Sequence, residues 1–367
     1  MSRFSKSAAC LILSGVFLSS TIGQSKKSSL FRNASIGMQG YYGSFLVTKS
    51  KAEYVRDSYA SFAEIYIQQQ TDGSRDWQRS HRLPQWGISF LHGNTGSRQY
   101  IGSLNAVSAY ITTPLITKKR YKGSFRLGAG PGWVKKPFDI HTNPKNTLIG
   151  TKLNAYILMM LQNEIQLSSR IFLNAGISFM HVSNGGTSLP NLGLNTPGIT
   201  AGIRYSFIKQ SLDPGKEIRD SFSKKINYRL SASLGLKQAP WIGSRHYLIN
   251  VLQAEATRRF AKNHAYGAGI VAFYNRSLKF DPLERPTDKH NNKRLQMGVY
   301  GAYEHFFGNL SIPLQAGVYV YNRDRFPFMF QQFGLRIRLN RHLSSEVLLK
   351  IHSGQADFIH TGISYRF

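Results

Sequence analysis

A histidine and a serine, His181 and Ser183, are the residues whose types and spacing could do chemistry in this chain. They follow a segment in which apolar residues alternate with others, and this alternation predicts a β-strand. Side chains two positions apart on a strand point to the same side, so both residues continue its apolar face. The other members of that face are Leu173, Ala175, Ile177 and Phe179. A base and a hydroxyl nucleophile at the edge of an apolar face indicate ester chemistry on a lipid substrate.

An esterase also needs a group that orients the base and donors that stabilise the oxyanion. Asn195 could orient His181 through its amide oxygen, as an asparagine does in some other hydrolases. Asn191, or the backbone of Gly185 and Gly186, could donate to the oxyanion. The spacing alone leaves the site open, because His-x-Ser pairs are common and Asn, Gly and Pro are also ordinary turn residues.

Strands that could position these residues are predicted along the rest of the chain. Residues 199–207, 334–340 and 359–367 alternate between an apolar face, which ends in aromatic residues, and a small, polar or basic face. Four arginines fall on the polar face of these segments, namely Arg204, Arg336, Arg338 and Arg366. In a soluble β-sandwich they would be ordinary solvent-facing charges, whereas in a membrane barrel they would face the lumen.

The N-terminal residues predict export. Two basic residues precede an apolar run, Ala8–Leu18, and small and polar residues follow it, as in a secretory signal peptide. We predict that residues 1–23 are removed by cleavage near Gly23 or Gln24. The single cysteine, Cys10, lies in this segment, so the exported chain would have no disulfide, thiolate metal site or cysteine nucleophile. No later apolar run approaches the ~20 residues that a transmembrane helix needs.

Export and alternation together favour an all-β fold, a transmembrane antiparallel β-barrel of the bacterial outer membrane with roughly 12–16 strands. We predict that residues 24–367 form it as a single barrel domain. The final Phe367, after Tyr365 and Ile363, resembles the terminal signature of bacterial outer-membrane barrels. The predicted loops are Thr71–Pro84, Pro137–Asn146, Asn184–Gly198, Lys209–Ser223 and Asp281–Lys293.

The charge of the chain is strongly one-sided, with 47 Lys+Arg against 18 Asp+Glu and a formal net charge of +29. A basic chain suggests nucleic acid, but no helix-turn-helix, zinc-finger or RNA-recognition signature is visible and the basic residues are scattered. We therefore predict no nucleic-acid partner. An anionic membrane surface explains the charge equally well.

The core motif His-Val-Ser-Asn-Gly at 181–185 resembles the active-site motif of lipid A 3-O-deacylases, which are outer-membrane barrels. The pair at 190–191 falls where that family has its Pro-Asn pair. The resemblance implies these roles: His181 as base, Ser183 as nucleophile, Asn191 as oxyanion donor, and Asn184 and Gly185 as substrate-binding residues. At lower specificity, residues 84–90, 143–154 and 349–367 look like long proteins described as acyloxyacyl hydrolases.

Asn195 departs from the deacylase pattern, because that family has an acidic residue at this position. The spacing is also similar to that of outer-membrane phospholipase A, which has an asparagine twelve residues after the nucleophile; its calcium-ligand pattern is not recognisable here. Glu164 could replace the missing acid, but we expect it to face the barrel lumen. The other histidines lie apart in the sequence and form no metal-ligand pair: His92, His141, His246, His264, His305 and His352.

The leading hypothesis is a membrane-embedded serine esterase that hydrolyses a fatty-acyl ester of lipid A or lipopolysaccharide in the outer membrane. Its basic loops would suit the phosphates of that substrate, and the scheme requires no metal or cofactor. A phospholipase A-type acyl hydrolase, acting on phospholipid, is the second hypothesis. The third is a structural or channel barrel in which the motif is a relic.

Overall fold

The computed structural model describes residues 33–46, 50–209, 222–239, 241–279, 294–323 and 327–367. These residues form sixteen antiparallel strands. The predicted signal peptide lies outside these residues, as do almost all of Lys209–Ser223 and all of Asp281–Lys293. The first eight strands are β1 (Ala34–Gly43), β2 (Ala60–Gln70), β3 (Gln85–Asn94), β4 (Ser103–Lys118), β5 (Tyr121–Val134), β6 (Leu153–Gln166), β7 (Ile171–Ser183) and β8 (Leu194–Ser206).

The remaining strands are β9 (Ile226–Gln238), β10 (His246–Ala261), β11 (His264–Asn275), β12 (Leu295–Phe307), β13 (Leu310–Asn322), β14 (Met329–Arg338), β15 (Leu343–His352) and β16 (Gln355–Arg366). Within the described residues, three short helices lie in the connections, η1 (Ser50–Val55), α2 (Asp76–Ser80) and η2 (Arg276–Lys279). Across the described ranges, no helix is both long and apolar enough to cross a membrane.

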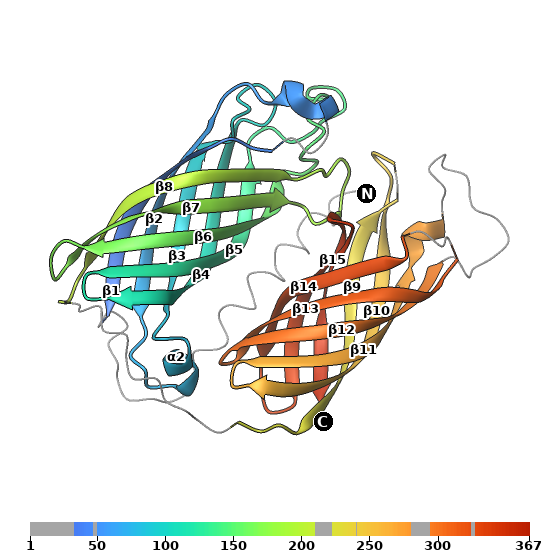
Figure 1. The fold of residues 1–367 in the computed structure, drawn as a ribbon. Helices are drawn as coiled ribbons and strands as arrows, with labels where there is room; N and C mark the ends of the chain where they lie inside the picture. The colour runs from blue at the N-terminus through green and yellow to red at the C-terminus, as the bar shows by residue number, and fades with distance from the viewer. Residues whose placement is uncertain (1–32, 47–49, 210–221, 240, 280–293, 324–326) are drawn as a thin grey trace.

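The strands close into two barrels rather than one (Figure 1). β1 pairs with β8, for example Met38 with Ile203, and this closes the first barrel after eight strands. β9 pairs with β16, for example Ala232 with Ile363, and closes the second. The all-β antiparallel barrel fold is confirmed, and the total of sixteen described strands falls within the predicted range, although each barrel has eight. The structure differs from the prediction that residues 24–367 form a single barrel, because the strands close into two.

Alternation could not distinguish one barrel from two, because it reports which side chains point outward but not which strand closes the sheet. The side chains in the two lumens fit closure after eight strands. An eight-stranded barrel has an interior just wide enough for side chains to fill, and both interiors here are filled.

The outer surface of both barrels is apolar. Ile177, Ile199 and Ile363 are 59%, 62% and 60% exposed, whereas the residues beside them in sequence point inward. An exposed apolar belt around a barrel with a polar interior is the pattern of barrels that face lipid. The predicted assignment of apolar and polar faces is therefore confirmed for β7, β8 and β16.

Ion pairs fill the lumen of the first barrel. Arg126 binds Glu64 with a 2.6 Å contact between Nη2 and Oε1. Arg204 and Lys122 both bind Glu164, with contacts of 2.8 and 3.0 Å. Glu164 therefore faces the lumen, as expected, and does not act as the acid that orients His181.

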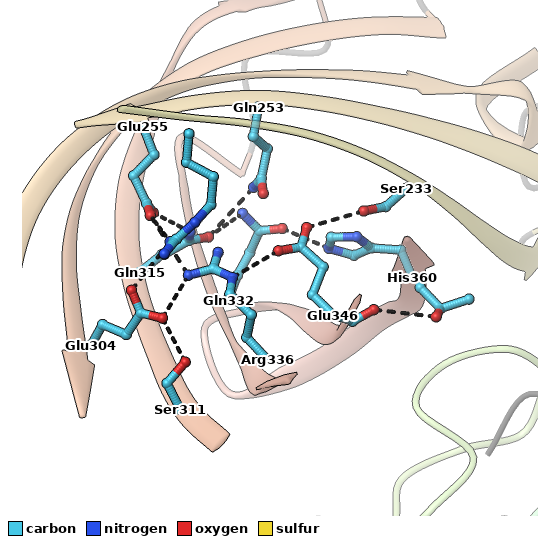
Figure 2. A network of polar contacts seen from close by, with 12 residues as sticks. Ser233, Gln253, Glu255, Glu304, Ser311, Gln315, Gln332, Arg336, Glu346 and His360 are labelled. Atoms are coloured by element: carbon cyan, nitrogen blue, oxygen red, sulfur yellow. Dashed lines mark hydrogen bonds and ion pairs between the residues drawn. The ribbon is translucent and has the colours of Figure 1, made fainter. Parts of the chain in front are cut away.

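A larger polar network crosses the lumen of the second barrel (Figure 2). Arg336 contacts Glu304 at 2.9 Å and Glu346 at 3.0 Å, while Arg229 contacts Glu255 at 2.7 Å. The amides and hydroxyls around them belong to Ser233, Gln253, Ser311, Gln315 and Gln332, with the imidazole of His360. Buried, mutually bonded side chains form a packed interior rather than a water-filled channel.

The two barrels lie side by side and touch at both ends (Figure 1). At one end, the Nδ2 of Asn263 lies 2.8 Å from the Ser80 hydroxyl, and the Nε2 atoms of His81 and His305 are 3.1 Å apart. At the other end, the loop between β7 and β8 contacts β9 and β10. This second contact brings part of the C-terminal barrel to the residues with candidate chemistry.

Candidate active site

Strand β7 places His181 and Ser183 on the outward face of the first barrel, in line with Leu173 and Ile177. The intervening residues, such as Met180 and Val182, are buried inside. His181 is half-buried at the edge of the apolar belt. Ser183 is only 4% exposed although its position is outward, so neighbouring segments cover it.

Strand β8 begins at Leu194, so the loop predicted as Asn184–Gly198 is shorter than expected. Pairing with β7 continues through Thr196 and Pro197, because an X-Pro segment keeps the extended conformation of a strand. The ladder sets Asn195 directly opposite His181. The orienting candidate is thus held on a paired strand rather than in a loop.

Asn195 contacts the imidazole directly: its Oδ1 lies 2.6 Å from the Nδ1 of His181. An amide oxygen can only accept a hydrogen bond, so Nδ1 carries the proton and Nε2 of the neutral ring is left as an acceptor. Gly193 makes room for the ring, since a Cβ there would lie 3.1 Å from Cε1 of His181. The structure brings His181 and Asn195 together in the geometry of a base and its orienting group.

The Ser183 hydroxyl lies among hydrogen-bond donors. The side chain of Asn191 packs against it, with Nδ2 2.9 Å and Oδ1 3.1 Å from Oγ. The backbone N–H of Gly185 donates to the same oxygen at 3.0 Å. Two donors about 3 Å from the nucleophile oxygen are suitably placed for an oxyanion that would form beside it.

The loop that carries these donors is organised by Asn184. Its backbone N–H donates to Oδ1 of Asn191 at 3.2 Å, which fixes the amide beside Ser183. Its side chain accepts from the N–H of Gly186 at 3.0 Å and donates to the carbonyl of Ser188 at 2.9 Å. Asn184 is therefore placed to shape the loop, whereas the motif predicted a substrate contact.

The imidazole of His181 and the hydroxyl of Ser183 share a face, but among the hydrogen bonds of the described residues none joins them. The hydroxyl is held by Asn191 and Gly185 instead. Catalytic hydrogen bonds are often long or absent without substrate and form when it binds. Proton transfer between these two residues would require Ser183 to exchange its contact with Asn191 for one with Nε2 of His181.

The second barrel covers residues 184–193, the loop between β7 and β8 that carries several candidate residues and that we call the active-site loop. The sequence did not predict this contact. A Cβ on Gly185 would lie 2.3 Å from Cδ1 of Ile359, and one on Gly186 would lie 2.5 Å from the carbonyl oxygen of Asp357. Both glycines also have positive φ. In the sequence, the adjacent glycines were the one feature that could have indicated this contact, because glycine permits close approach of another backbone.

Gln238, at the end of β9, holds the same loop by its backbone and its side chain. Its N–H donates to the carbonyl of Thr187 at 3.1 Å, and its Oε1 accepts from the N–H of Leu189 at 2.7 Å. The Nε2 of His246 lies 3.0 Å from the Ser188 hydroxyl. Three successive loop residues are thus bound to the second barrel just before Asn191.

The described residues contain no group of three or more His, Cys, Asp or Glu side chains that could hold a metal ion. The site itself is built from an imidazole, a hydroxyl, two carboxamides and backbone amides. Such a set can perform acyl transfer by nucleophilic attack and proton transfer.

Two family models match separate parts of the chain. Residues 62–204 match the family model of lipid A 3-O-deacylase (PagL), and residues 226–367 match the model of the acyloxyacyl hydrolase C-terminal domain. Each model matches one of the two barrels, so the chain resembles a lipid A 3-O-deacylase in its first barrel and the acyloxyacyl hydrolase C-terminal domain in its second. The first match covers β2 to β8 with all the candidate site residues, and the second covers the whole C-terminal barrel. The resemblance of the motif is therefore confirmed at the level of the PagL family.

Solved outer-membrane proteins are similar at low identity. Neisserial surface protein A is 9% identical, over 48% of this chain and 97% of that chain, with a TM-score of 0.32. Omp33 of Acinetobacter baumannii is 6% identical, over 91% of this chain and 97% of that chain, with a TM-score of 0.17. No curated protein matches the chain.

Proposed function

We propose that the protein is a serine esterase of the outer membrane that hydrolyses a fatty-acyl ester of lipid A. The observation that carries the proposal is the constellation on the outward face of the first barrel. There His181 is oriented by Asn195, while Ser183 is surrounded by the donors of Asn191 and Gly185. The family match over the same barrel names lipid A as the substrate of related proteins.

In the acylation step, Oγ of Ser183 attacks the ester carbonyl carbon as Nε2 of His181 takes its proton. The negative charge that forms on the carbonyl oxygen is stabilised by Nδ2 of Asn191 and the N–H of Gly185. Asn195 accepts from Nδ1 throughout, which holds the imidazole in the required tautomer.

Collapse of the tetrahedral intermediate breaks the bond between the carbonyl carbon and the sugar oxygen. The imidazolium of His181 gives its proton to that departing oxygen, which leaves as a hydroxyl. Water, deprotonated by His181, then attacks the acyl-serine and releases the fatty acid. As the acyl carbon–Oγ bond breaks, the imidazolium gives the proton taken from water to Oγ. The original proton of Ser183 has left on the sugar hydroxyl, so water supplies its replacement and both Ser183 and His181 are regenerated.

The surroundings of the site suit an acylated, phosphorylated lipid. The apolar belt of β7 leads directly to His181, so an acyl chain can lie against the barrel wall. Exposed basic residues lie on the loops at the same end of the barrel, namely Arg98, Lys135, Lys136, Lys145 and Lys152. Lysine and arginine form charge-assisted hydrogen bonds with phosphate.

A phospholipase A-type activity is the second candidate, because an asparagine rather than a carboxylate orients His181. The two candidates share the chemistry and differ in the alcohol that leaves. The C-terminal barrel matches the model of the acyloxyacyl hydrolase C-terminal domain, and this match favours lipid A over phospholipid as the substrate.

Mass analysis of both substrate classes tests the proposal. The purified full chain would be incubated with lipid A and, separately, with phospholipid vesicles. We expect lipid A to lose the mass of one acyl chain while phospholipid stays intact. Lysophospholipid with unchanged lipid A would establish the phospholipase activity instead, and no hydrolysis of either by folded protein would contradict both.

Replacing Asn195 tests how the base is oriented. Asn195→Leu removes the acceptor for Nδ1 of His181, and we expect kcat to fall about 10²-fold because the wrong tautomer becomes populated. Asn195→Asp keeps an acceptor and adds a charge that stabilises the imidazolium, so it should retain at least the parent rate. Equal rates for Asn195→Leu and the parent chain would rule out the orienting role.

Gln238 is predicted to position the catalytic loop from the second barrel. Gln238→Leu leaves the N–H of Leu189 without its acceptor, at a cost of about 1–3 kcal/mol. We expect a roughly tenfold lower kcat, with little change in KM, because Asn191 loses its fixed place beside Ser183.

The control for this variant is Gln253→Leu, which removes a buried amide from the same barrel far from the loop. It should leave kcat unchanged. Faster proteolysis within residues 184–190 is expected for Gln238→Leu alone. A normal kcat and normal protease resistance for Gln238→Leu would show that β9 does not hold the loop.

A further inference from the structure

Six arginines line the mouth of the second barrel at the end away from the active-site loop. They surround a depression of about 560 Å³, open solvent included: Arg229, Arg259, Arg336, Arg338, Arg341 and Arg366. The turns at this end are those between β10 and β11, β12 and β13, and β14 and β15. The active-site loop packs against the opposite end, beside Gln238 and Asp357.

The two inner arginines are already neutralised. Arg229 binds Glu255 and Glu304, and Arg336 binds Glu304 and Glu346 (Figure 2 shows the contacts of Arg336). Glu304, the carboxylate that lines the depression, also accepts from Ser311 at 2.6 Å. Its oxygens are therefore occupied by groups below the mouth.

The four outer arginines, Arg259, Arg338, Arg341 and Arg366, form what we call the arginine mouth. Among the described residues, none has a carboxylate within ion-pair distance. Their contacts are neutral instead. Arg259 lies 4.5 Å from the ring centre of Phe306, Arg338 donates to Oδ1 of Asn309 at 2.8 Å, and Arg366 donates to the carbonyl of Arg341 at 2.9 Å.

This arrangement has an electrostatic cost. The four arginines of the arginine mouth line the same depression without a carboxylate partner among the described residues, so their like charges repel one another. Arg259, Arg338 and Arg366 are half-buried, so water screens them less than it screens surface charges. A bound anion would remove the repulsion, and guanidinium groups fit the paired oxygens of phosphate.

We propose that the arginine mouth is a binding site for a phosphate group, supplied either by a lipid head group or by free phosphate. The site lies at the opposite end of the molecule from Ser183. It therefore does not depend on the proposed esterase activity, and its test needs no turnover.

Native mass spectrometry of the full chain, released from neutral detergent, provides the test. Inorganic phosphate and a short-chain phosphatidylglycerol would be added in separate titrations. We expect one saturable adduct, weakened by added salt, and at least about tenfold weaker binding after the double substitution Arg338→Gln with Arg366→Gln. Competition between the two probes would show that they share the site. Tighter binding of phosphatidylglycerol than of phosphate would identify the lipid head group as the source, and binding of phosphate alone would identify free phosphate.

Arg258→Gln is the matched control. Arg258 neighbours Arg259 on β10 but is exposed, and it donates to the carbonyl of Lys224 at 3.0 Å. The Arg258→Gln variant should bind both probes as tightly as the parent chain does. The single variant Arg366→Gln, which removes one like charge, provides a second test if the double variant folds poorly. The proposal is overturned if neither probe saturates, if folded arginine-mouth variants bind like the parent, or if Arg258→Gln weakens binding equally.

Discussion

Ser183→Ala should lower fatty-acid release by at least about 10³-fold while the protein keeps its fold. The substitution removes only Oγ, and the reaction proposed here forms its covalent bond through that atom. The donors of Asn191 and Gly185 remain in place, so substrate binding should change little and the loss should fall on kcat. Release of fatty acid from lipid A, followed by mass spectrometry, measures it.

Ser178→Ala is the matched control for that variant. Ser178 lies on the same strand but faces the lumen, and its hydroxyl contacts the carbonyl of Gly198 at 3.4 Å. Its loss should leave the rate unchanged. Heat-resistant electrophoretic mobility would report whether each variant is folded. Undiminished hydrolysis by folded Ser183→Ala would remove Ser183 from the mechanism.

His181→Ala is expected to have a similar effect, about 10³-fold on kcat, because the nucleophile loses its base and the leaving oxygen loses its acid. Asn195 stays on β8, where its ladder pairing does not require the imidazole. The barrel should therefore fold as before, and the measured loss can be assigned to proton transfer.

The first barrel contains a close internal control for this substitution. His92 is also outward-facing, stands opposite Asn105 across the β3–β4 ladder, and has its Nδ1 2.8 Å from Oδ1 of Asn105. Ser183 follows His181 by two residues, whereas the residue at the same distance after His92 is Asn94, which has no hydroxyl. His92→Ala should have normal activity. If it were as defective as His181→Ala, the loss could not be attributed to a base beside Ser183.

The geometry of β7 was predictable because alternation in a barrel wall has a fixed meaning. The exposed Ile177 and the buried Met180 fix which way His181 must point. Asn195 could be named from its spacing, but its place opposite His181 depended on where β8 begins. Pro197 and the turn-like residues around it concealed that strand start.

The contribution of the second barrel could not be predicted from the motif. Gln238 and Ile359 approach the loop only because β9 pairs with β16 and closes a separate barrel. No local pattern encodes a pairing between strands so distant in sequence. The burial of Ser183 on an outward face likewise follows from tertiary packing, since alternation alone would leave it exposed.

Covalent labelling of the folded full chain with an alkyl fluorophosphonate tests the central claim most directly, because this reagent captures an activated serine. We expect one adduct, on the peptide that contains Ser183, with much slower labelling in His181→Ala and none in Ser183→Ala. An adduct on another residue, or unchanged labelling of Ser183→Ala, would contradict the assignment of Ser183 as the nucleophile.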